Sequence, residues 1–183
     1  MPYNVFLIDI MNRIGSDERR AAVQSILQSY FDPIAKKASF KDGSAVRFVT
    51  NTPKPADFEL VAYYGSSAWH VVSQMPGAKM PKNAEGGGLT VWNGKVTASD
   101  VSADTTTDTR TLANLTFHEL MHNKLHMGEE MHRLGGLAAG TVDSAMRPSE
   151  SNNTVMSGAL RTKRPQWTDG VQAMVERNKP IVP

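Results

Sequence analysis

Two histidines and a glutamate in the run His118-Glu119-Leu120-Met121-His122 have the types and spacing for metal-assisted chemistry. On a helix, residues four apart lie on one face, one turn above each other, so both imidazoles can reach a single ion. Glu119 then lies beside that ion, where its carboxylate can take a proton from water. The run therefore indicates a catalytic metal centre with His118 and His122 as ligands and Glu119 as general base.

The segment around this run has the features of a helix. From Thr109 to Met127 it contains no Gly or Pro, and leucines together with Phe117 supply an apolar face. Asp108 and the threonines before it are N-cap candidates, and Gly128 is the expected stop. The competing interpretation is two ordinary helix histidines next to a coincidental glutamate. We favour the metal centre because the run lies in the helical context that its chemistry requires.

A catalytic zinc ion (Zn²⁺) usually takes three protein ligands and leaves one position for water. The chain has no cysteine, so the third ligand must be His, Asp or Glu. His126 continues the same helix, but eight residues along a straight helix place it about 12 Å from His118. His132 follows Gly128, where the chain can leave the helix and turn back. We therefore expect His132 to be the third ligand.

The sequence leaves other groups open. The alternatives to His132 as third ligand are, in order, Asp143, Glu150, Glu176 and His126. A side chain outside the motif is also expected to stabilise an oxyanion. The available groups are Tyr63, Tyr64, His70 and Arg161, and nothing in the sequence selects one of them.

The pattern of apolar residues predicts an α+β arrangement of elements. In order, we expect a strand over 4–10, a helix capped by Ser16 and ending near Pro33, strands over 45–50, 58–64 and 89–92, the motif helix, and a last helix over 168–178. The strand over 58–64 is almost continuously apolar, which predicts a central position. Residues 74–88 and 99–107 are expected to be loops, and the chain between Gly128 and Thr168 is expected to be irregular.

The motif and the order of elements across residues 4–128 resemble the zincin metallopeptidases. The resemblance implies a small twisted mixed sheet with a backing helix, an active-site helix, and a lower, irregular C-terminal part that supplies the third ligand. It also implies an edge strand that bounds the cleft and pairs with extended substrate, for which Leu89–Trp92 is the candidate. The function implied is zinc-dependent hydrolysis of peptide bonds in a protein or peptide substrate.

Features after the motif helix resemble particular zincin subgroups. His132 resembles the third histidine of the metzincins, although the usual positions of their glycine and third histidine hold Leu125 and Gly128 here, so the spacing is atypical. Thr154-Val155-Met156-Ser157 resembles the metzincin turn whose methionine lies beneath the metal, although a core methionine is the commoner explanation.

The carboxylate alternatives resemble other subgroups. Gly140-Thr141-Val142-Asp143 matches the first half of the aspzincin segment that supplies an aspartate ligand, while Met146 and Arg147 depart from its second half. Glu150 and Glu176 would serve as a glutamate ligand in the gluzincin manner.

Composition limits the classes of function. At 183 residues the chain suits one domain, 1–183, with an ordinary hydrophobic core. The formal net charge is +2, and acidic and basic residues are interspersed, so we expect no nucleic-acid partner. No apolar stretch approaches the length of a transmembrane helix. The run Val5–Met11 lacks a preceding basic stretch and a cleavage site, so we expect a strand there and no signal peptide.

Two other classes of function are kept as alternatives. One is a secreted or phage-encoded toxin or effector domain with another hydrolytic target, and the other is a non-catalytic metal-binding protein. Glu119 favours catalysis, because a structural metal needs no general base beside it. An unregulated peptidase would endanger its producer, so we expect export by a dedicated secretion system or a cognate inhibitor or immunity protein. The sequence leaves the localisation open.

Overall fold

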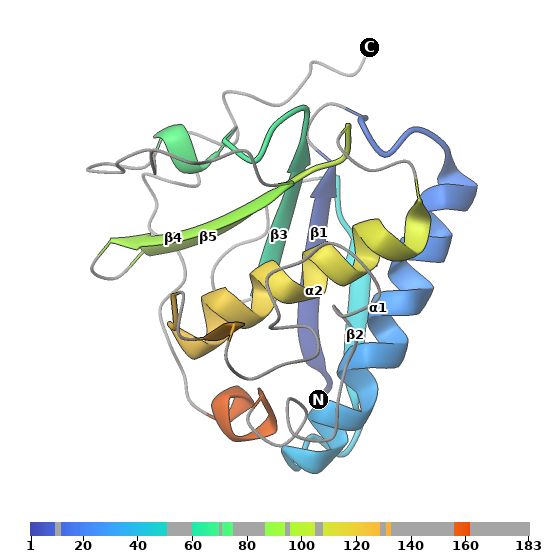
Figure 1. Cartoon of the computed structure of the whole chain (residues 1–183). Helices are drawn as coiled ribbons and strands as arrows, with labels where there is room; N and C mark the ends of the chain where they lie inside the picture. The colour runs from blue at the N-terminus through green and yellow to red at the C-terminus, as the bar shows by residue number, and fades with distance from the viewer. Residues whose placement is uncertain are drawn as a thin grey trace.

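The computed structural model describes residues 1–9, 12–50, 60–69, 71–74, 87–93, 96–104, 108–128, 131–132 and 156–161. Within them, a five-stranded sheet and two long helices form a mixed α+β fold, as the sequence predicts (Figure 1). The elements are β1 (Tyr3–Asp9), α1 (Asp17–Lys37), β2 (Ser44–Phe48), β3 (Leu60–Gly65), the short 3₁₀ helix η1 (Val72–Gln74), β4 (Gly88–Asn93), β5 (Val96–Ser102) and α2 (Thr109–Leu125).

The strand order of the sheet is β2-β1-β3-β5-β4. The β1–β2, β1–β3 and β3–β5 pairs are parallel, and β4 pairs antiparallel with β5 at one edge. The strand β3 is the middle one and every residue in it is buried, which confirms the central position predicted from its apolar run. The mixed sheet thus ends in an antiparallel edge strand, and that strand is the predicted Leu89–Trp92 segment lengthened at both ends.

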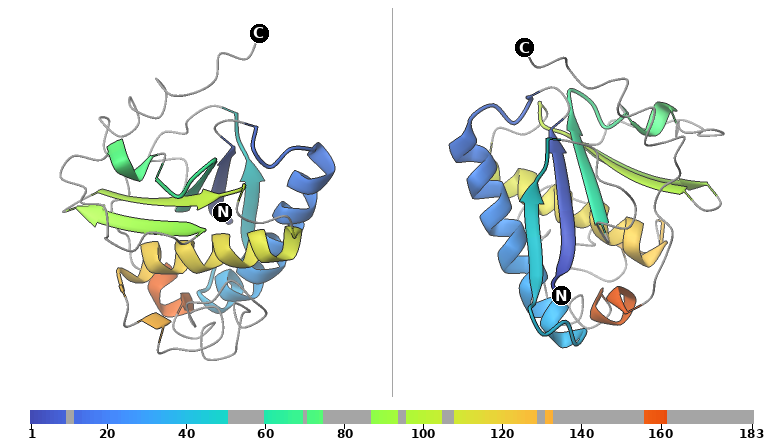
Figure 2. Two further views of the ribbon diagram at one scale, coloured as in Figure 1. Left: turned by 45° about the horizontal axis from the view of Figure 1, so that its top comes forward. Right: turned by 180° about the vertical axis from the view of Figure 1, so that it is seen from behind.

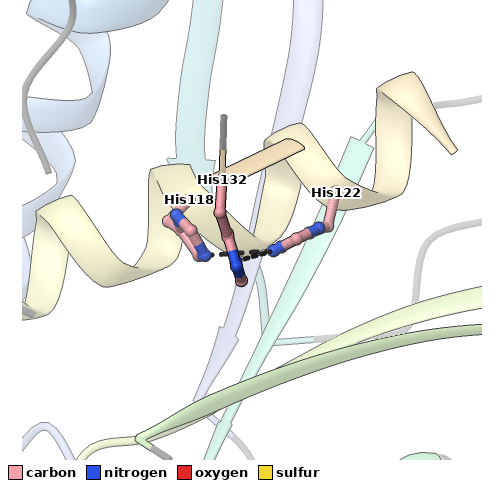
Figure 3. A group of neighbouring side chains, drawn as sticks. All are labelled: His118, His122 and His132. Carbon is pink, nitrogen blue, oxygen red and sulfur yellow. Dashed lines mark hydrogen bonds between the residues drawn. The ribbon is translucent and has the colours of Figure 1, made fainter. Parts of the chain in front are cut away.

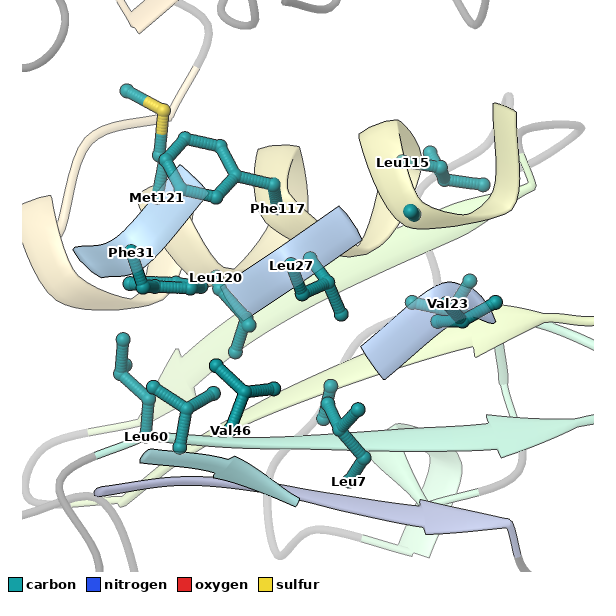
Figure 4. Close-up of a cluster of buried hydrophobic side chains, with 14 of the residues drawn as sticks. Leu7, Val23, Leu27, Phe31, Val46, Leu60, Leu115, Phe117, Leu120 and Met121 are labelled. Atoms are coloured by element: carbon teal, nitrogen blue, oxygen red, sulfur yellow. The ribbon is translucent and has the colours of Figure 1, made fainter. Parts of the chain in front are cut away.

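Both long helices cover the same face of the sheet, as the view from behind shows with the strands in front of them (Figure 2). The main core lies between the sheet and these helices (Figure 4). There the rings of Phe31 in α1 and Phe117 in α2 lie 4.9 Å apart, and Tyr30 donates a hydrogen bond of 2.7 Å to Asn114. Aromatic packing and the Tyr30–Asn114 hydrogen bond therefore hold the motif helix against α1.

The opposite face of the sheet carries a second, smaller core. Because side chains alternate along a strand, Phe6, Ile8 and Tyr63 point away from the long helices and pack against Val71 and Val72 near η1. Each of the strands β1 and β3 therefore buries side chains on both of its faces.

The strand β5 corrects the prediction of a loop over 99–107, because the sheet continues through Ser102. Ser99 and Asp100 are buried although they are polar. Main-chain groups bind both side chains: Ser99 lies at hydrogen-bond distance from the carbonyl of Glu119, and Oδ2 of Asp100 accepts from the N–H groups of Val71 and Val72. Oδ1 of Asp100 is buried and has no partner within the described residues. Such a strand is stable only because tertiary partners bind its polar groups. Its sequence by itself is therefore typical of a loop.

The helix α1 begins as predicted and ends later than predicted. Ser16 caps it by accepting a hydrogen bond of 3.2 Å from the N–H of Arg19. The helix then passes through Pro33 to Lys37, whereas an end near Pro33 was expected. Ile34 and Ala35 beyond the proline are fully buried. The free energy gained by burying these side chains offsets the cost of the backbone hydrogen bond that proline cannot make.

The motif helix α2 begins at the predicted cap, where Asp108 accepts a hydrogen bond of 2.6 Å from the N–H of Thr111. It ends at Leu125, two residues before the predicted end, and His126 rather than Gly128 makes the stop. His126 has a left-handed backbone with φ of 54° and donates its N–H to the carbonyl of His122. Histidine adopts this conformation more readily than most residues with a side chain.

The C-terminal third is described only in part. Residues 156–160 are helical within a stretch expected to be irregular, and Met156 and Leu160 of this turn are buried in the main core. Burial of these two side chains on one face of a turn explains the departure from the prediction. The predicted helix over 168–178 lies outside the described residues. Among the helices that are described, none has the length and hydropathy to cross a membrane.

Candidate metal centre

Three histidine side chains converge beside α2 (Figure 3). The Nε2 atom of His122 lies 3.0 Å from Nε2 of His118 and 3.2 Å from Nε2 of His132. One ligand atom from each residue lies within 4.8 Å of the other two, which is close enough to bind one metal ion. The structure thus brings together the two motif histidines and the downstream histidine ranked first from the sequence. We call His118, His122 and His132 the histidine cluster.

The helix α2 positions the first two members of the cluster by its own geometry. His118 and His122 are separated by one turn, and their ring centroids lie 4.6 Å apart. Phe117, Leu120 and Met121, on the sides of the helix turned to the core, are fully buried. Packing of these side chains fixes the rotation of the helix about its axis, and so directs the histidines away from the core.

The third histidine returns to the helix through a short reversal of the chain. The left-handed backbone of His126 turns the chain out of α2, and a hydrogen bond of 3.0 Å from the N–H of Met131 to the carbonyl of Gly128 closes a turn. Met131 is fully buried in the main core and anchors this turn. The next residue, His132, lies with its ring nearly parallel to that of His118, at an interplanar angle of 19°.

The hydrogen bonding of His122 identifies which of its nitrogens faces the cluster without a proton. Its Nδ1 lies 2.7 Å from the main-chain carbonyl oxygen of Met127. A carbonyl oxygen only accepts hydrogen bonds, so Nδ1 carries the proton and the neutral ring keeps a lone pair on Nε2. This is the arrangement in which a backbone carbonyl orients a metal-ligating imidazole.

The histidine cluster fits a metal ion chemically. The Nε2 atoms lie 3.0 and 3.2 Å apart, and each imidazole can offer a lone pair on Nε2 to a cation between them. Two nitrogens bound to one tetrahedral zinc ion lie about 3.4 Å apart, given zinc–nitrogen distances of about 2.0–2.1 Å. Imidazole donors suit zinc and other first-row transition metals. A three-histidine set also leaves a fourth position for water or substrate.

Glu119 directly follows His118 on α2 and is buried, with 5% of its surface exposed. Burial and, to a smaller extent, the charge of Asp100 raise the pKa of its carboxyl, to a net value of about 8. A hydrogen bond of 2.7 Å from the Thr90 hydroxyl to Oε2 lowers the pKa and partly opposes these effects. A carboxyl group that titrates near neutral pH is suited to accept and return a proton.

The edge strand β4 closes one side of the Glu119 side chain. A Cβ atom at Gly88 would lie 2.7 Å from both Cγ and Oε1 of Glu119, so any larger residue at this position would displace the carboxylate. Thr90, two residues along the same strand face, makes the hydrogen bond to Oε2. The sequence analysis missed both residues, because no motif or spacing links them to Glu119. Only the pairing of β4 with β5 beside α2 brings them there.

Other residues considered from the sequence lie elsewhere. His126 is not part of the histidine cluster, and its ring stacks on Trp92 at 5.5 Å between centroids. Tyr63 and Tyr64 are fully buried in β3, where the Tyr64 hydroxyl shares a hydrogen bond of 2.8 Å with Thr116. The Arg161 guanidinium donates to the carbonyl of Lys37. His70, Asp143, Glu150 and Glu176 lie outside the described residues.

Met156, from the segment that resembles the metzincin turn, is fully buried in the main core. Thr154 and Val155 of that segment lie outside the described residues. Packing in the core by itself explains a buried methionine.

Comparisons of the chain with protein-family models, with curated proteins and with solved structures found no match. The chemistry of the histidine cluster is therefore inferred from its own residues and from their positions in the fold.

Proposed function

We propose that the protein is a zinc-dependent metallopeptidase of the zincin type, in which the histidine cluster holds the metal and Glu119 is the general base. One observation carries this proposal: three imidazole Nε2 atoms converge at α2, and the residue directly after the first of these histidines on that helix carries a buried carboxylate. Metal ligands alone would suit many proteins. A buried carboxylate on the residue directly after His118 favours hydrolysis.

The arrangement of elements supports a zincin-like fold. The sheet has helix α1 packed on it, and α2, which bears the motif, lies along β3, β4 and β5 on the same face. The antiparallel edge strand β4 lies beside the motif helix. These are the features that the resemblance to zincins implies for the upper part of the domain.

The position of β4 supports a peptide as substrate. On one side β4 pairs with β5, and within the described residues its other side pairs with no strand. The main-chain N–H and C=O groups on that side can pair with an extended peptide, which would then run past Glu119.

A bound zinc ion would act as a Lewis acid that polarises the scissile carbonyl and acidifies water. Glu119 accepts a proton from that water and returns it to the leaving amine. Within the described part of the chain, Glu119 Oε2 takes the Thr90 hydrogen bond and Oε1 takes none. Gly88 leaves space beside Oε1, and we assign the proton transfer to this oxygen.

The proposal is tested by measuring metal content and proteolysis together. The purified protein is expected to hold about one zinc ion per chain, and His118→Ala is expected to lose most of it. Glu119→Gln is expected to keep the zinc and the fold but to lose about 10²- to 10⁴-fold in hydrolysis of a denatured protein. Glu18→Gln, an exposed change in the first turn of α1, is the matched control and should behave like the parent.

The results separate the proposal from its alternatives. Near-normal turnover in Glu119→Gln contradicts the role of Glu119, and loss of zinc in this variant makes Glu119 a ligand. Stoichiometric zinc without hydrolysis of peptides favours another hydrolytic target or a non-catalytic metal-binding protein. Hydrolysis of small ester and amide substrates by the parent then distinguishes those two.

A further inference from the structure

The Thr90 hydroxyl occupies a junction between three oxygen atoms. Its Oγ1 lies 2.7 Å from Oε2 of Glu119, 2.9 Å from the main-chain oxygen of Glu119 and 2.9 Å from Oγ of Ser99. A threonine hydroxyl has one proton and can donate one strong hydrogen bond. The carboxylate oxygen is the closest of the three, and an ionised carboxylate is the strongest acceptor among them.

Neighbouring donors leave the Thr90 proton available for that carboxylate. Asn123, one turn after Glu119 on α2, donates from Nδ2 to Ser99 Oγ at 3.2 Å. Ser99 can pass its own proton to the main-chain oxygen of Glu119, which lies 3.2 Å away, or to Thr90. When Ser99 donates to Thr90, the proton of Thr90 is left for Glu119 Oε2. The order Asn123, Ser99, Thr90, Glu119 is thus a chain of donors that ends on the carboxylate.

The sheet register places these groups on one face. Thr90 of β4 and Ser99 of β5 are directly paired across the two strands, and both side chains reach α2. A slip of one residue in this pairing would turn Thr90 to the other face of the sheet. Asn123 and Ser99 are almost completely buried, so the hydrogen bonds form away from bulk water.

We propose that Thr90 is a positioning residue that holds the Glu119 carboxylate through one oxygen and ties the substrate-pairing strand β4 to the general base. This inference rests on the proposed function. Gly88 supports the same geometry, since its missing side chain makes room for the carboxylate on the side of Oε1. The hydroxyl of Thr90, rather than its shape, does the positioning.

The kinetic test compares Thr90→Val, which keeps the shape, with Thr90→Ser, which keeps the hydroxyl. Thr90→Val is expected to keep its zinc and to lose about 10- to 100-fold in kcat on a denatured protein, with KM within about threefold of the parent. Thr90→Ser is expected to restore kcat to within about threefold of the parent. Thr111→Val, in the first turn of α2, is the matched control for a threonine-to-valine change and should leave kcat unchanged.

A second test needs neither metal nor activity. In the chelated protein, Thr90→Val is expected to lower the melting temperature by about 4 °C, from loss of the hydrogen bond to the Glu119 carboxyl group. The same change in a Glu119→Ala background is expected to cost less than half of that, because the acceptor is already gone. This double-mutant cycle still reports on the contact if the parent hydrolyses no peptide, which would be a failure of the proposed function alone.

Three results would overturn the inference. Equal shifts in melting temperature in the two backgrounds would mean that Thr90 and Glu119 are not coupled. Equal losses of kcat in Thr90→Val and Thr90→Ser would mean that shape, and not the hydroxyl, matters. Loss of zinc in Thr90→Val would assign the residue to the metal centre instead of to the carboxylate.

Discussion

At the scale of single residues, the two histidines that follow the motif have opposite roles although they are only six positions apart. His126 takes a left-handed backbone, ends the helix and stacks on Trp92. His132 reaches the cluster because Met131 beside it is buried in the core. The backbone conformation of the first histidine thus directs the second one to the metal centre.

We expect His132→Ala to weaken zinc affinity far more than His126→Ala does. The first change removes one of three ligands, whereas the second removes a side chain that lies outside the cluster. A group that only supports a ligand typically contributes about 10- to 100-fold to metal affinity. Titration of both variants with a competing chelator measures the difference.

The same titration tests the alternative ligands, which lie outside the described residues. If His132→Ala binds zinc like the parent while Asp143→Ala does not, the aspartate holds the metal and the role assigned to His132 is wrong. Glu150→Gln and Glu176→Gln should both bind zinc like the parent.

At the scale of elements, the motif helix α2 depends on its N-cap residue, Asp108, to accept hydrogen bonds from the backbone N–H groups of its first turn. Asp108 accepts hydrogen bonds from the side chain of Thr111 and, at 2.6 Å, from its N–H, and these bonds lower the pKa of the carboxyl below its ordinary range. The helix dipole also favours a negative charge at this end.

We therefore expect Asp108→Ala to reduce the free energy of unfolding by about 1 kcal/mol, as loss of an N-cap typically does. Zinc stoichiometry should remain unchanged, since the cluster lies in the second half of α2 and beyond. Chemical denaturation with metal analysis measures both quantities. Ser16→Ala at the cap of α1 is the matched control and should have a similar cost. A loss of zinc from Asp108→Ala alone would contradict this local role.

A second element-scale feature joins β5 to η1 on the far face of the sheet. Asp100 is buried, and its Oδ2 accepts hydrogen bonds of 2.7 and 2.8 Å from Val71 and Val72. Burial raises the pKa of Asp100 from 3.8 to about 7, against the lowering effect of these two bonds. The folded protein therefore binds this proton more tightly than the unfolded chain does. Protonated Asp100 therefore contributes to the free energy of unfolding. This contribution is complete below the ordinary aspartate pKa of 3.8 and is lost as the pH rises to about 7.

Asp100→Asn stays neutral and can still accept from both N–H groups, so it should lack this dependence on pH. We expect its melting temperature relative to the parent to rise between pH 4 and pH 8 and then to level off. Thermal unfolding of the chelated proteins across that range measures the difference, with and without Asp100→Asn in a Glu119→Gln background, because the charge of Asp100 also shifts the pKa of Glu119. A difference that does not vary with pH would contradict the raised pKa.

At the scale of the whole molecule, a metal in the histidine cluster would connect the motif helix to the chain that follows it. Two ligands belong to α2 and the third lies beyond the turn at Gly128. A ligand that binds only the folded state stabilises it by about 2.7 kcal/mol when present at a hundred times its dissociation constant. Zinc should therefore raise the stability of the protein as a whole.

We expect chelation to lower the melting temperature of the parent by about 5 to 10 °C, and re-addition of zinc to restore it. His118→Ala, which lacks a ligand, should melt at nearly the same temperature with and without chelator. Scanning calorimetry of both proteins gives the shifts. An equal shift in the two would show that the chelator acts at a different place.

Much of the candidate site follows from the sequence because its geometry is local. A helix places His118 and His122 on one face whatever surrounds it, and Asp108 caps the helix through atoms three residues away. The apolar runs of β1 and β3 likewise predict buried strands from local composition alone. In each case the backbone geometry of one element determines which side chains lie together.

The remaining features were decided by tertiary structure. The continuation of α1 past Pro33 depends on buried partners, and the polar strand β5 depends on main-chain groups of α2 and of the chain entering η1. The return of His132 to the cluster depends on the burial of Met131, and the contact of Thr90 with Glu119 depends on strand register. These contacts join residues that no local period relates, and their free energy exists only once the chain has folded. The sequence alone therefore identifies a helix with two candidate metal ligands, and tertiary packing brings His132, Thr90 and Gly88 to it.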